Sequence, residues 1–136
     1  MLTVLRAFTL IFGFVGGAAF AANTAEENAL VYVLKQIVNL EHEGTIWAAL
    51  AKSNYRNMNL EEREILSQDE LWRAEIGTSD PELIGLISAT AASAYLRTVV
   101  AESEGRITEI IVMDATGSNA AISNVTTDYW QGDEAK

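Results

Sequence analysis

Cysteine is absent from this sequence of 136 residues, and histidine and proline occur once each. Without cysteine the folded chain has no disulfide bonds and depends on packing for its stability. The single histidine, His42, has no second metal ligand four residues away, so the zinc-binding helix pattern is missing. No serine lies in the G-x-S-x-G pattern of a nucleophile elbow. We therefore expect no metal, no cofactor and no enzymatic activity.

Basic residues are also scarce. Nine lysines and arginines stand against nineteen aspartates and glutamates, which gives a net charge of −10 at neutral pH. The basic residues form no cluster, whereas proteins that bind nucleic acid or anionic membranes present a basic face to the phosphate groups. We therefore expect no nucleic acid among the partners of this protein.

The N-terminal segment has the three parts of a secretory signal peptide. Arg6 supplies positive charge, residues 7–15 form an apolar core, and Ala19 and Ala21 place small residues where a signal peptidase cleaves. The apolar core is too short to span ~30 Å of hydrocarbon, although a retained anchor or a buried helix is the alternative. The pattern predicts a signal peptide over residues 1–21, cleaved near Ala21, and a bacterial periplasmic or secreted protein.

The exported domain, residues 22–136, begins with helical patterns. Apolar residues recur at helical spacing over three stretches, which are residues 24–51, 60–76 and 81–104. The first predicts a long N-terminal helix that Gly44 interrupts without necessarily breaking. The third predicts a helix with Pro81 in its first turn and Ser79 or Asp80 as its N-terminal cap.

The pattern changes to strands after Gly105. Residues 107–113 are β-branched and apolar on both faces, as in a strand that is covered on two sides. Residues 114–117 carry a turn signal with glycine at its end, and residues 120–123 are short enough to form the returning strand. The sequence therefore predicts a β-hairpin. Two such apolar strands make a marginal sheet, so we expect more sheet from a partner or from further chain.

Residues 107–136 carry a family resemblance. A strand, a D-x-x-G turn and a strand ending in serine precede the segment Thr-Asp-Tyr-Trp-Gln-Gly-Asp-Glu at residues 127–134. This arrangement resembles the extracytoplasmic PAS-like sensor domains called PDC or Cache domains, in their small secreted bacterial form. The resemblance implies an α+β fold, with a long N-terminal helix and further helices packed on a PAS-like antiparallel sheet. Because the family pattern continues with more strands, we expect the sheet to be incomplete in this chain.

The same resemblance implies a ligand-binding site at Tyr129, Trp130 and Asp133. The two aromatic residues would form a rigid wall, and the carboxylate would hold a cationic amine. The ligand class that we expect is an amino acid or a carboxylate. The alternative is that Trp130 fills the hydrophobic core and Asp133 caps a short helix that begins near Gly132.

These features predict a non-catalytic sensor module that binds a small extracytoplasmic molecule. Because it would lack a membrane segment after cleavage, it would need a membrane receptor as its signalling partner. Extracytoplasmic sensors of this type often pair through their long N-terminal helix, so four residues there are candidates for a homodimer seam: Leu30, Leu34, Ile37 and Val38.

Two other functions are alternatives. The first is a structural or interaction protein of the bacterial envelope, with the same fold and its pocket filled by side chains. The second, ranked lower, is an acid-dependent hydrolase with Asp133 among its carboxylates. The acidic run from Glu61 to Glu70 is more typical of a solvated helix face than of such a catalytic pair.

Overall fold

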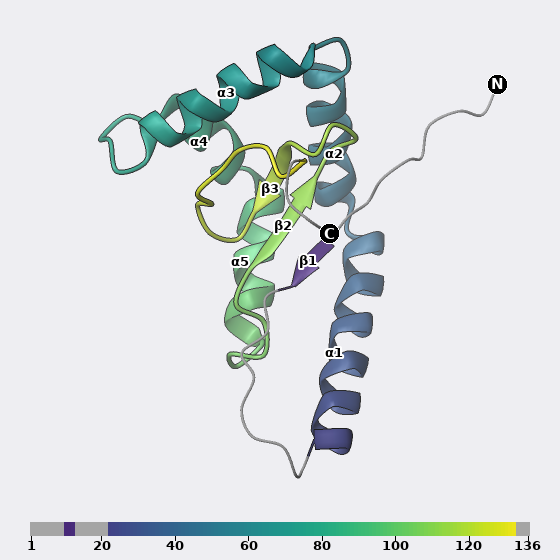
Figure 1. Cartoon of the computed structure of the whole chain (residues 1–136). Coiled ribbons are helices and arrows are strands. Elements are labelled where there is room, and N and C mark those ends of the chain that lie inside the picture. Colours follow the sequence, from purple (N-terminus) through teal and green to yellow (C-terminus); the bar gives the residue numbers. More distant parts are fainter. Residues whose placement is uncertain (1–9, 13–21, 133–136) are drawn as a thin grey trace, which may run out of the picture.

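The fold is α+β, as predicted. The computed structural model describes residues 10–12 and 22–132, and the side chains of residues 26–132. In these ranges the elements are, in chain order, β1 (Leu10–Phe12), α1 (Ala22–His42), α2 (Gly44–Asn57), α3 (Glu62–Glu75), α4 (Glu82–Ser88), α5 (Ala91–Glu102), β2 (Ile110–Met113) and β3 (Asn119–Ile122). Figure 1 shows the helices gathered around the small sheet, with the lower part of α1 extending away from the rest.

The predicted hairpin is confirmed. β2 and β3 pair antiparallel, with Ile111 opposite Ile122, and the register shifts at a bulge between Val112 and Met113. Gly117 has a φ of 86°, a left-handed conformation that glycine adopts without steric cost and that closes the turn. The D-x-x-G signal therefore predicted the turn because its glycine meets a real backbone requirement.

The sheet has a third strand that we did not predict. β1 pairs antiparallel with the other edge of β2, placing Leu10 opposite Val112 and Phe12 opposite Ile110, so the strand order is β1-β2-β3. β1 lies within the segment whose sequence predicts a signal peptide. The sheet is small, with three short strands in the described residues.

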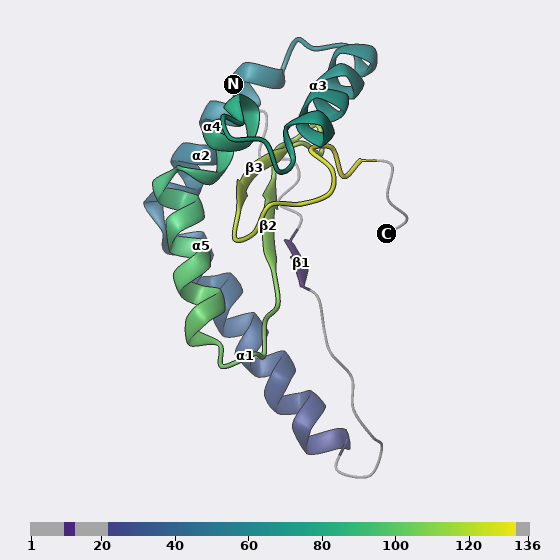
Figure 2. The same cartoon turned by 90° about the vertical axis from the view of Figure 1, so that its left-hand side faces the viewer.

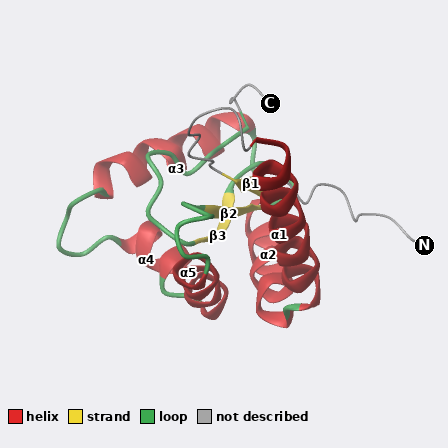
Figure 3. Ribbon diagram, turned by 90° about the horizontal axis from the view of Figure 1, so that it is seen from below, coloured by secondary structure: helices red, strands yellow, loops and turns green. Residues whose placement is uncertain are grey.

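Each face of the sheet carries its own hydrophobic cluster, with helices on several sides of the strands in Figure 3. Ile110 and Val112 of β2 belong to one cluster, together with residues from α2 and α5. Ile111 and Met113 point to the opposite face, whose cluster contains residues from α3 and α4. All four residues of β2 are buried, which confirms the prediction of a strand covered on both faces.

The predicted N-terminal helix is two helices. α1 ends at His42, and α2 begins at Gly44. Glu43 lies between them in an extended conformation and its carboxylate accepts a hydrogen bond from the Thr45 N–H at 3.1 Å. The predicted long N-terminal helix is therefore present as α1, but the interruption at Gly44 is a true break, because the Glu43 cap starts a new helix there.

The predicted third helix is also two helices, α4 and α5, bent by 66° at the break between them. The Thr90 hydroxyl accepts a hydrogen bond from the Ser93 N–H at 3.1 Å and so caps α5. Ser93 in turn donates to the Ile87 carbonyl at 2.8 Å and accepts from the Ile122 N–H at 3.0 Å. These side-chain bonds compete with the helical backbone pattern and end α4 early. Figure 2 shows the resulting change of direction.

The cap of α4 is not Ser79 or Asp80, as predicted, but Glu75 at the end of α3. Its carboxylate accepts hydrogen bonds from the backbone N–H groups of Leu83, at 3.0 Å, and Ile84, at 2.9 Å. Burial by itself raises the pKa of Glu75, but the hydrogen bonds from Leu83, Ile84 and Glu82 outweigh it and hold the pKa below its ordinary value. The carboxylate thus joins two helices while ionised.

We expect acid to weaken this joint. Because the folded protein lowers the pKa of Glu75, its contribution to stability is complete above the ordinary pKa of 4.5 and is lost as the pH falls through the lower folded value. The Glu75→Gln variant should therefore lose less thermal stability than the wild type between neutral pH and about pH 4. Calorimetry at both pH values measures this difference. The exposed Glu70→Gln variant is the control, and an identical acid response in all three proteins would contradict the prediction.

In the ranges that the structure describes, no single helix is both long and apolar enough to span a membrane. Only α4 and α5 taken together meet that criterion, and they are sharply bent.

Candidate functional site

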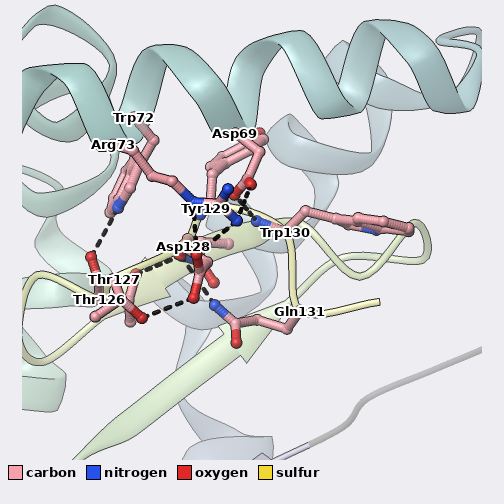
Figure 4. Close-up of polar contacts among 10 residues, drawn as sticks. Asp69, Trp72, Arg73, Thr126, Thr127, Asp128, Tyr129, Trp130 and Gln131 are labelled. Carbon is pink, nitrogen blue, oxygen red and sulfur yellow. Dashed lines mark hydrogen bonds and ion pairs between the residues drawn. The ribbon is translucent and has the colours of Figure 1, made fainter. Parts of the chain in front are cut away.

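The segment with the family resemblance folds back onto the hairpin. Trp130 forms an isolated antiparallel bridge with Ser118. The Asn119 N–H donates to the Tyr129 carbonyl, and the Gln131 N–H donates to the Gly117 carbonyl, both at 2.9 Å. Figure 4 shows this segment lying between the sheet and α3. One isolated bridge and these backbone hydrogen bonds therefore hold residues 126–131, an irregular segment, against the hairpin.

Asp69 on α3 fastens this segment. Its Oδ1 atom accepts hydrogen bonds from the backbone N–H groups of Tyr129, at 2.7 Å, and Trp130, at 3.1 Å. Its other oxygen pairs with Arg73, which also pairs with Asp128 at 2.7 Å (Figure 4). Asp69 is buried, so the prediction that the whole acidic run forms a solvated face was wrong at this position. Its burial follows from its partners, which lie about sixty residues further along the chain.

Asp128 is held in its ionised form. The Thr127 hydroxyl donates to its carboxylate at 2.7 Å, and Arg73 lies on its other side. The hydrogen bond from Thr127, and after it the interactions with Arg73, lower the pKa of Asp128 against the opposing effect of burial. The ion pair between α3 and the segment therefore persists at mildly acidic pH.

Tyr129 is completely buried in the cluster on the α3 side of the sheet. Its ring lies 5.7 Å from that of Trp72, centroid to centroid. Its hydroxyl accepts hydrogen bonds from Asn57, at 3.0 Å, and from Arg56, at 3.1 Å. Tyr129 thus occupies the core position that we considered for Trp130. Its hydroxyl oxygen lies at the end of α2.

Asp114 lies beside the same group and is also buried. Its Oδ2 atom accepts hydrogen bonds from the Ser53 hydroxyl at 2.8 Å and the Asn57 amide at 2.7 Å. Its Oδ1 atom accepts from the backbone N–H groups of Thr116 and Ser118, which shape the hairpin turn. We call the set formed by Ser53, Arg56, Asn57, Asp114 and Tyr129 the Tyr129 cluster.

Two atoms of the Tyr129 cluster have unused hydrogen-bonding capacity. Of the buried side-chain atoms in the described part of the chain, four lack a partner, and two of these are Arg56 Nε and Asn57 Oδ1. The first is a donor on a positive group and the second is an acceptor. Buried polar atoms without partners are rare in folded proteins and call for a specific explanation, such as a bound water or ligand. The cluster is therefore the candidate binding site.

Trp130 has different surroundings from Tyr129. It is partly exposed, and its indole N–H donates to the Thr116 carbonyl at 2.8 Å. The indole lies against Gly132, so closely that a Cβ atom on this glycine would overlap the ring. The alternative that Trp130 fills the core is therefore wrong. Asp133, the third predicted site residue, lies outside the described residues, as does the helix cap proposed for it.

The contact between Gly132 and Trp130 predicts a pair of opposite effects. Gly132→Ala should displace the indole and destabilise the protein by about 1 kcal/mol, because a methyl group must be accommodated where there is no space. Gly85→Ala, within α4 and with nothing within 4 Å of its Cβ, should instead stabilise the protein by about 0.5 kcal/mol. Urea denaturation measures both changes. If both variants changed the free energy of unfolding in the same direction, the close contact between Gly132 and Trp130 would be contradicted.

Sequence reasoning missed three members of the cluster: Ser53, Arg56 and Asn57. We expected the stretch from Lys52 to Asn59 to be a polar connection, but α2 continues to Asn57. The three residues are spaced by three and four positions, which places them on one face of a helix. That spacing was the available signal, although it does not identify Asp114 and Tyr129 as partners.

The described residues contain no group of three or more histidine, cysteine, aspartate or glutamate side chains arranged to hold a metal ion. The resemblance to Cache-type domains is carried by the sequence of residues 107–136. Comparison with known proteins found no matching family model, no matching curated protein and no matching solved structure.

Proposed function

We propose that this protein is an extracytoplasmic module of the PDC or Cache type that binds a small molecule without transforming it. The observation that carries the proposal is the unpaired donor and acceptor of the Tyr129 cluster, Arg56 Nε and Asn57 Oδ1. The segment with the family resemblance supplies Tyr129 to this cluster, and Trp130 covers the adjacent turn. The segment with the resemblance thus contacts the two residues that have unused hydrogen-bonding capacity.

The chemistry of the cluster favours an amino acid or another carboxylate as the ligand. A guanidinium group binds carboxylates through charge-assisted hydrogen bonds, and Arg56 Nε is a free donor of that kind. Asn57 Oδ1 is suited to accept from an amine or an amide of the same ligand. Asp133 is the further residue that we propose to hold a cationic amine.

The hydrogen bonds that the nearby carboxylates accept favour binding without catalysis. Asp69 and Asp114 each accept several hydrogen bonds from backbone N–H groups or side chains. A general acid or base must be free to exchange a proton with the substrate. Because both carboxylates are fully engaged, they support a structural role rather than hydrolysis.

A membrane receptor and a second copy of the chain are the partners that we propose. Leu30, Leu34 and Val38 lie one helical turn apart on α1, and each is at least half exposed. Ile37, the fourth candidate, is partly buried. An exposed apolar stripe on a helix that extends from the body is consistent with a homodimer seam.

Ligand screening by thermal shift tests the proposed function. We expect at least one amino acid or small carboxylate to raise the melting temperature in a saturable manner, because a ligand that binds only the folded state stabilises it. Arg56→Gln should abolish this increase while the protein still folds. Arg97→Gln, an exposed arginine that donates to the Ser88 carbonyl, is the matched control and should retain it. No shift with any ligand, or a shift that survives in Arg56→Gln, would contradict the proposal.

The location is tested separately. After expression with its own leader in a bacterial host, the protein should be recovered from the periplasm or the medium with Ala22 as its first residue. N-terminal sequencing identifies the processed end. Recovery from the cytoplasm with Met1 intact would contradict the proposed export.

A second candidate is a structural or interaction protein of the envelope with the same fold. One observation favours it, namely that Tyr129 and Trp72 are completely buried in the cluster on their side of the sheet. In that case Arg56 and Asn57 would serve only to hold α2 on the hairpin, and the thermal-shift screen would find no ligand.

A further inference from the structure

The edge of β2 that faces away from β3 is unusual for an edge of a sheet. Edge strands are normally protected by charge, proline or covering segments, because their free N–H and C=O groups recruit other strands. β2 consists of four apolar residues, all buried, and has none of these protective residues. Among the described strands, only β1, which has three residues, covers the outer edge of β2.

The hydrogen-bonding groups on this edge follow from the alternation of a strand. The Ile110 carbonyl accepts from the Ser123 N–H, so the backbone groups of Ile110 face β3, and those of Val112 do the same. The N–H and C=O groups of Ile111 therefore face β1, where Ile11 is the opposite residue. Removal of β1 would expose them.

β1 belongs to the proposed signal peptide, so this inference rests on the proposed export. Cleavage near Ala21 would separate Leu10–Phe12 from the domain. A two-stranded sheet is marginally stable, and the exposed edge of β2 would be left as an apolar template. The exported protein would then have an open edge on β2, without the strand that covers this edge in the full chain.

We infer that, after export, this edge of β2 is a strand-binding site that takes an extended apolar segment of another polypeptide in antiparallel register. The strand seated there in this structure has those properties: it is extended, antiparallel, uncharged and apolar. Addition of a strand to an open sheet edge is an established mode of peptide recognition, in which backbone hydrogen bonds supply much of the affinity.

A second copy of the chain is a poorer occupant. In an antiparallel pair of two copies, Ile111 would lie opposite Ile111, because its N–H and C=O groups face outward. The full chain carries a net charge of −10, and cleavage would remove Arg6 and make each copy one unit more negative. Two such copies repel each other at long range. An uncharged segment avoids this repulsion.

Peptide binding to the processed protein tests the inference. The probe is a fluorescent peptide with the sequence of residues 7–15 and added lysines for solubility, measured by fluorescence anisotropy. The processed protein should bind it saturably. The unprocessed full chain should bind it at least about tenfold more weakly, because its own β1 competes at the high effective concentration of a tethered segment.

Two proline peptides provide the matched control. Ile11→Pro removes an N–H that faces β2 and should weaken binding about tenfold. Leu10→Pro removes an N–H that faces away from β2 and should bind nearly as well as the parent peptide. Hydrogen exchange gives a second measurement. The bound peptide should protect the Ile111 amide, whereas the Val112 amide, which faces β3, should be protected with or without it.

Each other outcome has a distinct meaning. A processed protein that binds no peptide, or binds both proline peptides equally, would overturn the strand-binding site but leave the ligand screen unaffected. A processed dimer whose Ile111 amide is protected without peptide would show that a second copy occupies the edge, and would also overturn the inference. Recovery of Met1 at the N-terminus would overturn the proposed export and this inference with it, since the edge would keep its own strand.

Discussion

Replacing Trp72 with alanine is expected to lower the free energy of unfolding by about 4 kcal/mol, as for other large aromatic residues removed from a core. Trp72 is completely buried and packs on Tyr129. Its indole N–H also donates to the Thr126 carbonyl at 2.8 Å, so the substitution removes packing and a buried hydrogen bond at once. Urea denaturation followed by circular dichroism measures the loss without depending on tryptophan fluorescence.

The control for this variant is Trp47→Ala. The Trp47 indole N–H donates to the Glu41 carbonyl at 2.7 Å, but the residue is 38% exposed. Removing it should cost about 1 kcal/mol, because little apolar surface is withdrawn from the core. Trp72→Phe, which keeps a ring in the core, should fall between the two alanine variants. A cost for Trp47→Ala as large as that for Trp72→Ala would contradict the assignment of the core.

Asp114→Asn is expected to destabilise the protein by about 3 kcal/mol, because it leaves buried hydrogen-bonding groups without partners. Both oxygens of Asp114 accept hydrogen bonds, from Ser53 and Asn57 on one side and from the turn on the other. An amide has only one acceptor oxygen, so its NH₂ group must face one of these sets of donors. The melting temperature should fall by about 10 °C, which calorimetry measures.

Asp80→Asn is the matched control for this effect, since the side chain of Asp80 is exposed in the loop before α4. The change in unfolding free energy for that variant should stay within about 0.5 kcal/mol. If Asp114→Asn were equally harmless, the Tyr129 cluster would not be a determinant of the fold, and its role in positioning Arg56 for a ligand would lose its support.

Local features that the sequence predicted well share one property, which is that neighbouring residues suffice to produce them. The hairpin follows from the alternating apolar residues of β2 and from Gly117, which adopts the left-handed conformation that the turn needs. α3 lies within the predicted range because its capping box joins Glu61 and Glu64, three residues apart. The absence of cysteine determined that non-covalent contacts, and not disulfide bonds, hold the fold together.

Several features that were mispredicted depend on contacts between different elements. α4 is capped by Glu75 from the preceding helix, and Ser93 near the start of α5 accepts a hydrogen bond from the sheet, so the local cap at Thr90 is only part of the break between them. The β1 strand was assigned to an apolar leader, because a short apolar run is compatible with both uses.

The predicted site shows the same division between sequence and tertiary structure. The family resemblance singled out Tyr129 and Trp130, but only Tyr129 is buried in the core. Asp69 holds both residues in place, since it accepts hydrogen bonds from both backbone N–H groups. Arg56 and Asn57 join Tyr129 across more than seventy residues of sequence. By itself, therefore, the sequence determined the α+β class, the hairpin and the candidate aromatic residues, whereas only the tertiary structure decided which polar groups surround them, because those contacts arise from packing between distant segments.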